Sequence, residues 1–338
     1  MPQPPSRSTP TALSVLSAAS LRGASLGAAS FLAASLLATS LLAGCSGGGS
    51  PGAGQLPAAT TAFQSETFGL HLPPPKVPGG LYVGEFSTGD VGEYALPTKG
   101  NESPRCTLSG FSEVNGIGVN SKHVLYVPDG ATRKIYTYAA DCGTQGVTLS
   151  DSNGQPSDVA FDGKTVYVND ATSAKIDVFA NGATSPTSTL SNSAISGNNF
   201  GDAVDKSHNV YESSQSAVIV EYAGGAEPGT KLALNGLATP LGMDFDKQNN
   251  LLVTDTTNGL LIYASPYSGN PSKKVTLHNL SVYCKLDAPN KHLYCSDIIE
   301  GTVDAYSYPA VTYEYSISNG LVQSGSVEGI ALDPTNKS

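Results

Sequence analysis

Four oxygen-bearing side chains begin short apolar segments that recur along the chain: Asn115, Asp158, Asp202 and Glu328. Carboxylate and amide oxygens are the ligands that Ca²⁺ and similar hard divalent ions prefer. If the segments converge on one axis, these residues form a metal site at the mouth of a central channel. The alternative is that they are ordinary solvated polar residues, because three of the six segments begin with an apolar residue: Phe200 (in the segment of Asp202), Leu241 and Val282.

Sequence signatures of catalysis are missing elsewhere in the chain. There is no G-x-S-x-G nucleophile elbow, no H-E-x-x-H zinc motif, no glycine-rich phosphate loop and no EF-hand loop. The five histidines, at positions 71, 123, 208, 278 and 292, do not cluster. His123, His208 and His292 fall in predicted turns, where we expect them to be exposed and without a function. The sequence therefore favours a protein without catalytic activity.

A second set of polar residues ends each of the recurring apolar segments: Asn120, Asp162, Asp205, Asp246 and Asp287. Their side chains resemble a metal shell, but each is followed by turn residues at the same place in its repeat. Asp and Asn side chains commonly accept hydrogen bonds from the backbone two or more residues further on. We therefore predict that these residues stabilise their own turns.

The repeat itself has a period of about 42 residues. Strand-forming segments are centred on Tyr82, Tyr126, Tyr167, Tyr211, Leu252 and Tyr294, and a second aromatic residue follows each centre by about 12 positions. Each copy reads as four short strands joined by polar turns, which is the period of a propeller blade. The abundance of glycine (37 residues) agrees with a turn-rich, all-β chain. We predict a six-bladed β-propeller of four-stranded antiparallel blades over residues 79–338.

The two ends of the repeat region are complementary. The first copy has a strand at Tyr82 but no first strand before it, whereas residues 329–333 form a first strand with no partner after it. These halves predict a closed ring, in which a C-terminal strand completes the N-terminal blade.

Four cysteines follow Cys45, and they predict two disulfides in an exported protein. Counting outward from the turn at 288–291 places Cys284 directly opposite Cys295 on neighbouring strands, a spacing compatible with a bridge. Cys106 and Cys142 then remain, in the outer parts of consecutive blades. A metal site is the rival reading, but there is no CxxC spacing and no nearby histidine.

Two of the copies resemble the NHL repeat. One consists of 240–246 (PLGMDFD), 252–255 (LVTD) and 261–263 (LIY), and the other of 156–162 (PSDVAFD), 166–170 (VYVND) and 175–179 (KIDVF). Two copies depart from the pattern, with Ser214 and Glu85 at the position of the second-strand Asp. Asn115-Gly116 and Glu328-Gly329 are also similar to parts of the metal-binding pattern of gluconolactonase-type propellers. That resemblance implies a divalent metal in the channel and hydrolytic or lyase activity.

The N-terminus reads as an export signal. Arg7 and Arg22 precede an apolar run of small residues that ends in Leu42-Ala43-Gly44-Cys45, without acidic residues before the cysteine. It resembles a bacterial lipobox, which implies cleavage after 44 and acylation of Cys45. The alternatives are an ordinary signal peptide or a transmembrane anchor. Residues 45–78, rich in Gly, Ser and Pro, are predicted to be a flexible linker.

These patterns predict an extracytoplasmic lipoprotein of the bacterial cell envelope, in the outer membrane if the cell has one. The net charge of −10 argues against nucleic acid as a partner. The leading prediction is a binding or scaffolding module for a protein, peptide or glycan, with no cofactor. The alternative is a divalent-metal-dependent lactonase or lyase that uses the central channel.

Overall fold

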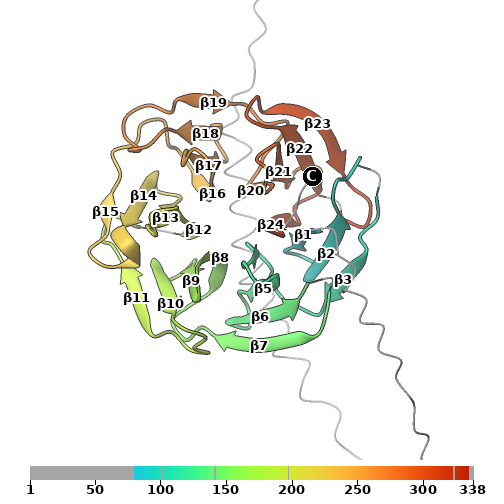
Figure 1. Cartoon of the computed structure of the whole chain (residues 1–338), viewed down its shortest axis with the longest axis horizontal. Helices are drawn as coiled ribbons and strands as arrows, with labels where there is room; N and C mark the ends of the chain where they lie inside the picture. Colours follow the sequence, from blue (N-terminus) through green and yellow to red (C-terminus); the bar gives the residue numbers. More distant parts are fainter. Residues whose placement is uncertain (1–79, 101, 141, 197, 323, 335–338) are drawn as a thin grey trace, which may run out of the picture. The chain divides into compact units, whose positions relative to one another are not determined.

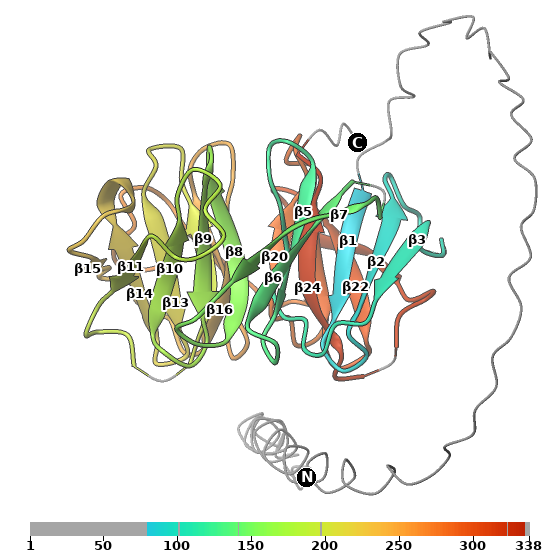
Figure 2. The same cartoon turned by 90° about the horizontal axis from the view of Figure 1, so that it is seen from below.

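The computed structural model describes residues 80–334 apart from 101, 141, 197 and 323. These residues form six four-stranded antiparallel sheets around one axis (Figure 1). Seen from the side, the sheets stand next to one another like the blades of a propeller (Figure 2). The predicted six-bladed β-propeller is confirmed. The predicted signal (1–44), Cys45 and linker (to 78) lie outside the described residues.

In each blade the strand nearest the axis is called the first strand, and the blades are numbered in chain order. Blade 1 contains β24 (Val327–Leu332), β1 (Gly80–Glu85), β2 (Asp90–Ala95) and β3 (Cys106–Ser109). Blade 2 contains β4 (Gly118–Val119), β5 (Val124–Asp129), β6 (Lys134–Ala139) and β7 (Gln145–Ser150). Blade 3 contains β8 (Pro156–Asp162), β9 (Thr165–Asp170), β10 (Lys175–Phe179) and β11 (Ser188–Ser191). Blade 4 contains β12 (Asn199–Val204), β13 (Val210–Ser214), β14 (Val218–Tyr222) and β15 (Thr230–Lys231), with the short 3₁₀ helix η1 (Ala223–Gly225) after β14. Blade 5 contains β16 (Pro240–Phe245), β17 (Leu251–Asp255), β18 (Gly259–Tyr263) and β19 (Lys273–Val275). Blade 6 contains β20 (Cys284–Leu286), β21 (His292–Asp297), β22 (Thr302–Ser307) and β23 (Thr312–Ile317).

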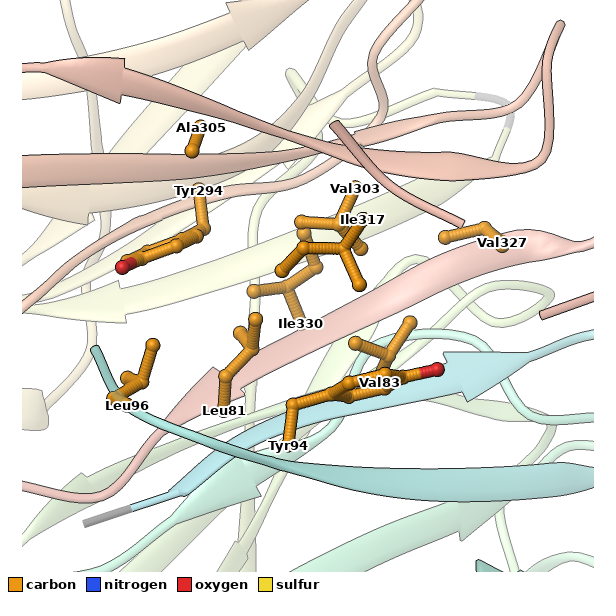
Figure 3. Close-up of a cluster of buried hydrophobic side chains, with 10 residues drawn as sticks. All are labelled: Leu81, Val83, Tyr94, Leu96, Tyr294, Val303, Ala305, Ile317, Val327 and Ile330. Atoms are coloured by element: carbon orange, nitrogen blue, oxygen red, sulfur yellow. The ribbon is translucent and has the colours of Figure 1, made fainter. Parts of the chain in front are cut away.

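Ring closure is made by β24, which pairs antiparallel with β1 and so becomes the first strand of blade 1. Tyr82 lies opposite Ala331, and Val83 lies opposite Ile330. The side chains of this joint pack against blade 6 in one buried cluster that contains Leu81, Tyr94, Tyr294 and Ile330 (Figure 3). Burial of apolar area is the main favourable term in folding. The predicted closure is confirmed, and it joins the two ends of the repeat region through the core.

The turns that follow the first strands behave as predicted at four of five positions. The side-chain Oδ1 atoms of Asn120, Asp205, Asp246 and Asp287 accept hydrogen bonds from backbone N–H groups of their own turns. Asp162 differs, because its turn is shortened by Gly163 and its carboxylate instead contacts His208 of blade 4, Nδ1 to Oδ1 at 2.7 Å.

Two histidines join neighbouring blades at these turns. His208 contacts Asp162 across blades 4 and 3, and His123 Nδ1 lies 2.9 Å from Asp333 Oδ2 across blades 2 and 1. His292 contacts Asp287 within its own blade. His208 is exposed as expected, whereas His123 and His292 are half-buried. His123 and His208 therefore have a structural contact that the sequence did not predict, since each links the turns of two neighbouring blades.

The Asp at the end of the second strand fixes the loop that enters the same blade. Asp255 accepts hydrogen bonds from the backbone N–H groups of Ala238 and Thr239 with Oδ2, and from its own turn with Oδ1. Glu85, one of the two departures from the NHL pattern, accepts from Val322 N in the same way. The substitution therefore keeps the role of the position.

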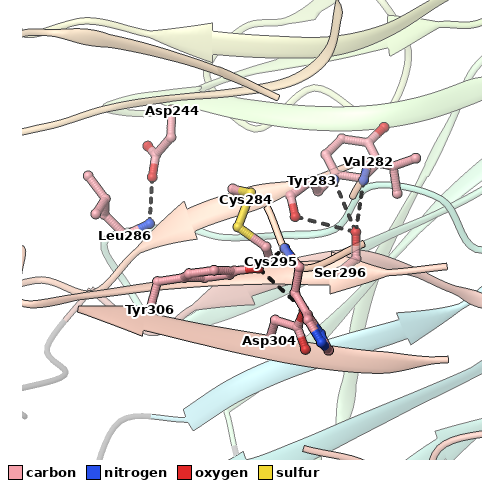
Figure 4. Close-up of a disulfide and its surroundings, with 10 residues drawn as sticks. Asp244, Val282, Tyr283, Cys284, Leu286, Cys295, Ser296, Asp304 and Tyr306 are labelled. Carbon is pink, nitrogen blue, oxygen red and sulfur yellow. Dashed lines mark hydrogen bonds and ion pairs between the residues drawn. A yellow bond between two sulfur atoms is a disulfide. The ribbon is translucent and has the colours of Figure 1, made fainter. Parts of the chain in front are cut away.

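Both predicted disulfides are present. Cys284 and Cys295 are directly opposed on β20 and β21, with Cα atoms 4.1 Å apart (Figure 4). Cys106 and Cys142 link blade 1 to blade 2, with Cα atoms 6.1 Å apart. These bonds support an oxidising compartment for the folded protein.

Within the described part of the chain, no helix has the length and apolar character needed to cross a bilayer.

The closing joint can be tested with two isoleucines that differ in burial. Ile330→Ala removes a fully buried side chain from the joint, so we expect the free energy of unfolding to fall by about 2–5 kcal/mol. Ile299→Ala is the matched control, because this side chain is 47% exposed, and it should change stability by about 0.5 kcal/mol or less. Urea denaturation followed by tyrosine fluorescence measures both. Equal effects of the two substitutions would contradict the closed ring.

Candidate functional site: the central channel and the front face

The channel is lined by one first-strand residue from each blade, the residue opposite the centre of the second strand. Four of these residues are small and two are charged: Gly118, Ala160, Ala203, Asp244, Lys285 and Ala331. Small residues are needed because six backbones approach one axis. The two charged residues, on adjacent blades 5 and 6, extend into the space that the small ones leave. A cavity of about 220 Å³ results, with Asp202, Asp244 and Lys285 in its wall.

The structure brings two of the four predicted metal ligands together. The side chains of Asp158 and Asp202 are fully buried, and Asp202 N donates a hydrogen bond to Asp158 Oδ2 at 3.3 Å. The carboxylate oxygens of Asp202 accept no hydrogen bond from an N–H group or a hydroxyl of the described residues. The pair therefore places two carboxyl groups side by side next to the channel.

Of the other two predicted ligands, Glu328 lies on β24, the strand that closes the ring, and Asn115 precedes β4 of blade 2. Asn115 is buried, and its carbonyl oxygen packs against Gly329, where an added Cβ would come within 2.2 Å of it. Burial, together with the charge of Glu113, raises the pKa of Glu328 to about 8.

The predicted carboxylates do not form one compact ligand group. Within the described residues, two groups of three His, Cys, Asp or Glu side chains bring their ligand atoms within 4.8 Å, and neither includes Asp158, Asp202 or Glu328. The metal assignment stays a prediction.

The side chains of those two groups already make structural contacts with other parts of the protein. In the first, Glu93 lies beside Cys106 and Cys142, whose sulfurs are joined in a disulfide and offer no thiolate. In the second, Asp297 and Asp304 accept hydrogen bonds from loop N–H groups and from Ser316 Oγ.

Asp244 and Lys285 complete the charged cluster, and the sequence analysis missed both. Lys285 Nζ donates a hydrogen bond to the carbonyl oxygen of Met243 at 2.9 Å. Asp244 accepts from Phe245 N at 2.8 Å and from Leu286 N at 2.7 Å, so it bridges blades 5 and 6 (Figure 4). Aligning the repeats on the second-strand centres would have shown both as charged exceptions in a column of small residues.

Burial and mutual charge set the protonation of this cluster. Burial raises the pKa of Asp158 to about 6, against the attraction of Lys285, which lowers it. The pKa of Asp202 is raised well above its usual range by burial and by the charge of Asp158. Burial would lower the pKa of Lys285, but the charges of Asp158, Asp244 and Asp202 outweigh it and raise the pKa. Lys285 is therefore held as an ammonium ion, and the two aspartates compete for a proton.

Tyr283 closes the channel on one side. The face at which the first strands begin is called the front face, and the other the back face. From the front of blade 6 the Tyr283 hydroxyl donates to the carbonyl oxygen of Phe200 at 2.5 Å on blade 4, and lies 3.4 Å from that of Ser157 on blade 3. Gly242 makes room for this ring, since an added Cβ would lie 2.7 Å from it. The charged cavity is consequently separated from the front face.

A second cavity, of about 370 Å³, lies between blades 5 and 6 on the front face. Its walls are the turn from 255 to 259 and the segment from 274 to 281. The walls combine apolar surface, including Leu277 and Leu280, with hydroxyls, amides and the carboxylate of Asp255. One ammonium group is present, Lys274 Nζ, which donates a hydrogen bond to Asn258 Oδ1 at 2.8 Å. The hydroxyl of Ser281 has no hydrogen-bond partner among the described residues. This cavity offers polar recognition groups on a rigid scaffold.

Comparisons with known proteins agree with the fold. No protein-family model matches the chain, and no curated protein matches its sequence. Many solved structures match the chain, among them one described as the crystal structure of a nidogen/laminin complex, with a TM-score of 0.63 at 16% sequence identity. The match covers 77% of this chain and 100% of that chain. At this identity the likeness shows the class of fold, a six-bladed β-propeller.

The aspartate pair predicts a pH dependence. Because folding raises the pKa of Asp158 and of Asp202, their contribution to stability is present at low pH. The contribution of Asp158 is lost as pH rises through about 6, and that of Asp202 as pH rises through its own raised pKa. Asp202→Asn removes the second acid, so the variant should lose less stability than the wild type between pH 5 and pH 8, by about 1–3 kcal/mol. Denaturation at both pH values measures this. Asp90→Asn, away from the channel, should follow the wild type, and the idea fails if Asp202→Asn does so too.

Proposed function

We propose that the chain is a membrane-tethered, extracytoplasmic binding module that holds its ligand on the front face of the propeller. The observation that carries the proposal is the cavity between blades 5 and 6, which mixes apolar surface with hydroxyl and amide groups and whose walls are loops fixed to a closed ring. Loops held by a rigid scaffold are the usual place for recognition. The ligand is a protein, a peptide or a glycan, since hydroxyls and amides can bond to any of these.

The direction of β1 supports a tether that leaves the front face free. Glu85, at the end of β1, lies opposite Val327, at the beginning of β24, so β1 ends at the front face and starts at Gly80 on the back face. The described chain thus begins at Gly80 on the back face, away from the front cavity. If residues 45–78 are the flexible linker that their composition predicts, their r.m.s. span would be roughly 30–35 Å. A ligand as large as a folded protein would then reach the front face without obstruction by the membrane.

The lipid anchor has its own test. Cys45→Ser should abolish labelling of the chain by radioactive fatty acid and release it from the membrane fraction. Labelling that survives the substitution would rule out this anchor.

No contact among the described residues of the channel supports the alternative function, a metal-dependent lactonase or lyase. It requires a divalent ion, and an ion there would share its carboxylates with the ammonium group of Lys285. The residues present fit that ion poorly, and we derive no reaction from it.

Site-specific photo-cross-linking tests the binding proposal in the membrane that carries the full-length chain. A photoreactive residue at Thr276, exposed in the wall of the front cavity, should give a reproducible adduct after irradiation. The same residue at Val147, which is 57% exposed on the outer strand β7, is the control and should give none. Lys274→Met should reduce the Thr276 adduct at least threefold. Absence of an adduct at Thr276, or an equal yield at Val147, would contradict the proposal.

A further inference from the structure

We propose that Lys285 is the built-in cation of the channel and occupies the site that a divalent metal ion would otherwise take. The proposal concerns the channel alone and is independent of ligand binding on the front face. It identifies the ligand class that the site would accept without the lysine, a hard divalent cation such as Ca²⁺.

The first step is the excess of negative charge. Asp158, Asp202 and Asp244 come from the first strands of three consecutive blades, and each interacts electrostatically with the ammonium group of Lys285 on the fourth. Uncompensated carboxylates in an apolar interior cost several kcal/mol each, so the channel needs a cation. Lys285 is the one cationic side chain among the described residues that line this cavity.

The second step is the match between the oxygens around Lys285 and the ligands of a metal ion. Its Nζ bonds the carbonyl oxygen of Met243, and neither oxygen of the buried Asp202 accepts a hydrogen bond from an N–H group or a hydroxyl of the described residues. Carbonyl and carboxylate oxygens are the ligands of Ca²⁺. The ammonium group is thus hydrogen-bonded to a carbonyl oxygen and lies within the electrostatic influence of the carboxylates of Asp158, Asp202 and Asp244.

The third step is exclusion. A Ca²⁺ ion at this place would stand close to the ammonium group, and repulsion between the two cations in a cavity of low dielectric would oppose its binding. The cavity of about 220 Å³ can hold an ion with water once the four-carbon side chain is shortened. Removal of the lysine is therefore expected to create a metal site.

The test compares four full-length proteins in calcium-binding calorimetry and in thermal unfolding with EDTA or Ca²⁺. The wild type should bind no Ca²⁺ in the channel, so its Tm should move by less than about 1 °C. Lys285→Ala should unfold several degrees lower in EDTA, and Ca²⁺ should restore its Tm in a saturable way. Lys285→Met also removes the charge but fills the space, so its Tm should fall without recovery. In Lys285→Ala/Asp202→Asn the affinity for Ca²⁺ should fall at least tenfold.

Two results would overturn the proposal. One is a folded Lys285→Ala protein that does not respond to Ca²⁺. The other is saturable Ca²⁺ binding by the wild type that Asp202→Asn abolishes, which would show that the ion and Lys285 share the channel. If Lys285→Ala does not fold, the comparison of the wild type with Asp202→Asn decides alone: loss of Ca²⁺ binding contradicts the proposal, and absence of binding in both supports it.

Discussion

The close approach of six first strands to one axis is the constraint on which the rest of the structure depends. Each first strand contacts the first strands of both neighbouring blades, and the backbones come so near that an added Cβ at Gly201 would lie 2.1 Å from the carbonyl oxygen of Leu241. Such packing is possible only if the ring is complete, because a missing first strand would expose the flanks of two blades. The pairing of β24 with β1 supplies the last strand, and the buried cluster behind it joins both ends of the repeat region.

The same constraint explains why charge in the channel has large consequences. Where the axis is lined by Gly118, Ala160, Ala203 and Ala331, there is no polar side chain to solvate an ion. Asp244 and Lys285 are half-buried there, and they interact electrostatically with each other and with the Asp158–Asp202 pair. The lysine balances part of the negative charge, and Tyr283 separates the cluster from the front face. In the proposed function recognition falls to the loops, of which those between blades 5 and 6 enclose a cavity with both polar and apolar groups.

Much of this fold could be predicted from the sequence, because repetition multiplies a weak signal. Six strand centres, the complementary ends and the opposition of Cys284 to Cys295 all follow from counting residues, and the structure confirms them. The turn role of Asp205 and Asp246 follows from local geometry in the same way. The contacts of Lys285 and Tyr283 could not be predicted so, since their partners lie on other blades, up to 126 residues away. The front cavity likewise arises from two loops whose separation depends on the angle between blades.

The most direct test of the central claim is the protonation of Lys285. In an NMR titration of the side-chain ammonium group, with Lys285→Met used to assign the signal, the account predicts that Lys285 stays protonated to a pH above the ordinary pKa of lysine, because the aspartates of the channel stabilise its charge. Deprotonation of Lys285 well below that value would show that burial outweighs the carboxylates, and would contradict the assignment of this lysine as the cation of the channel.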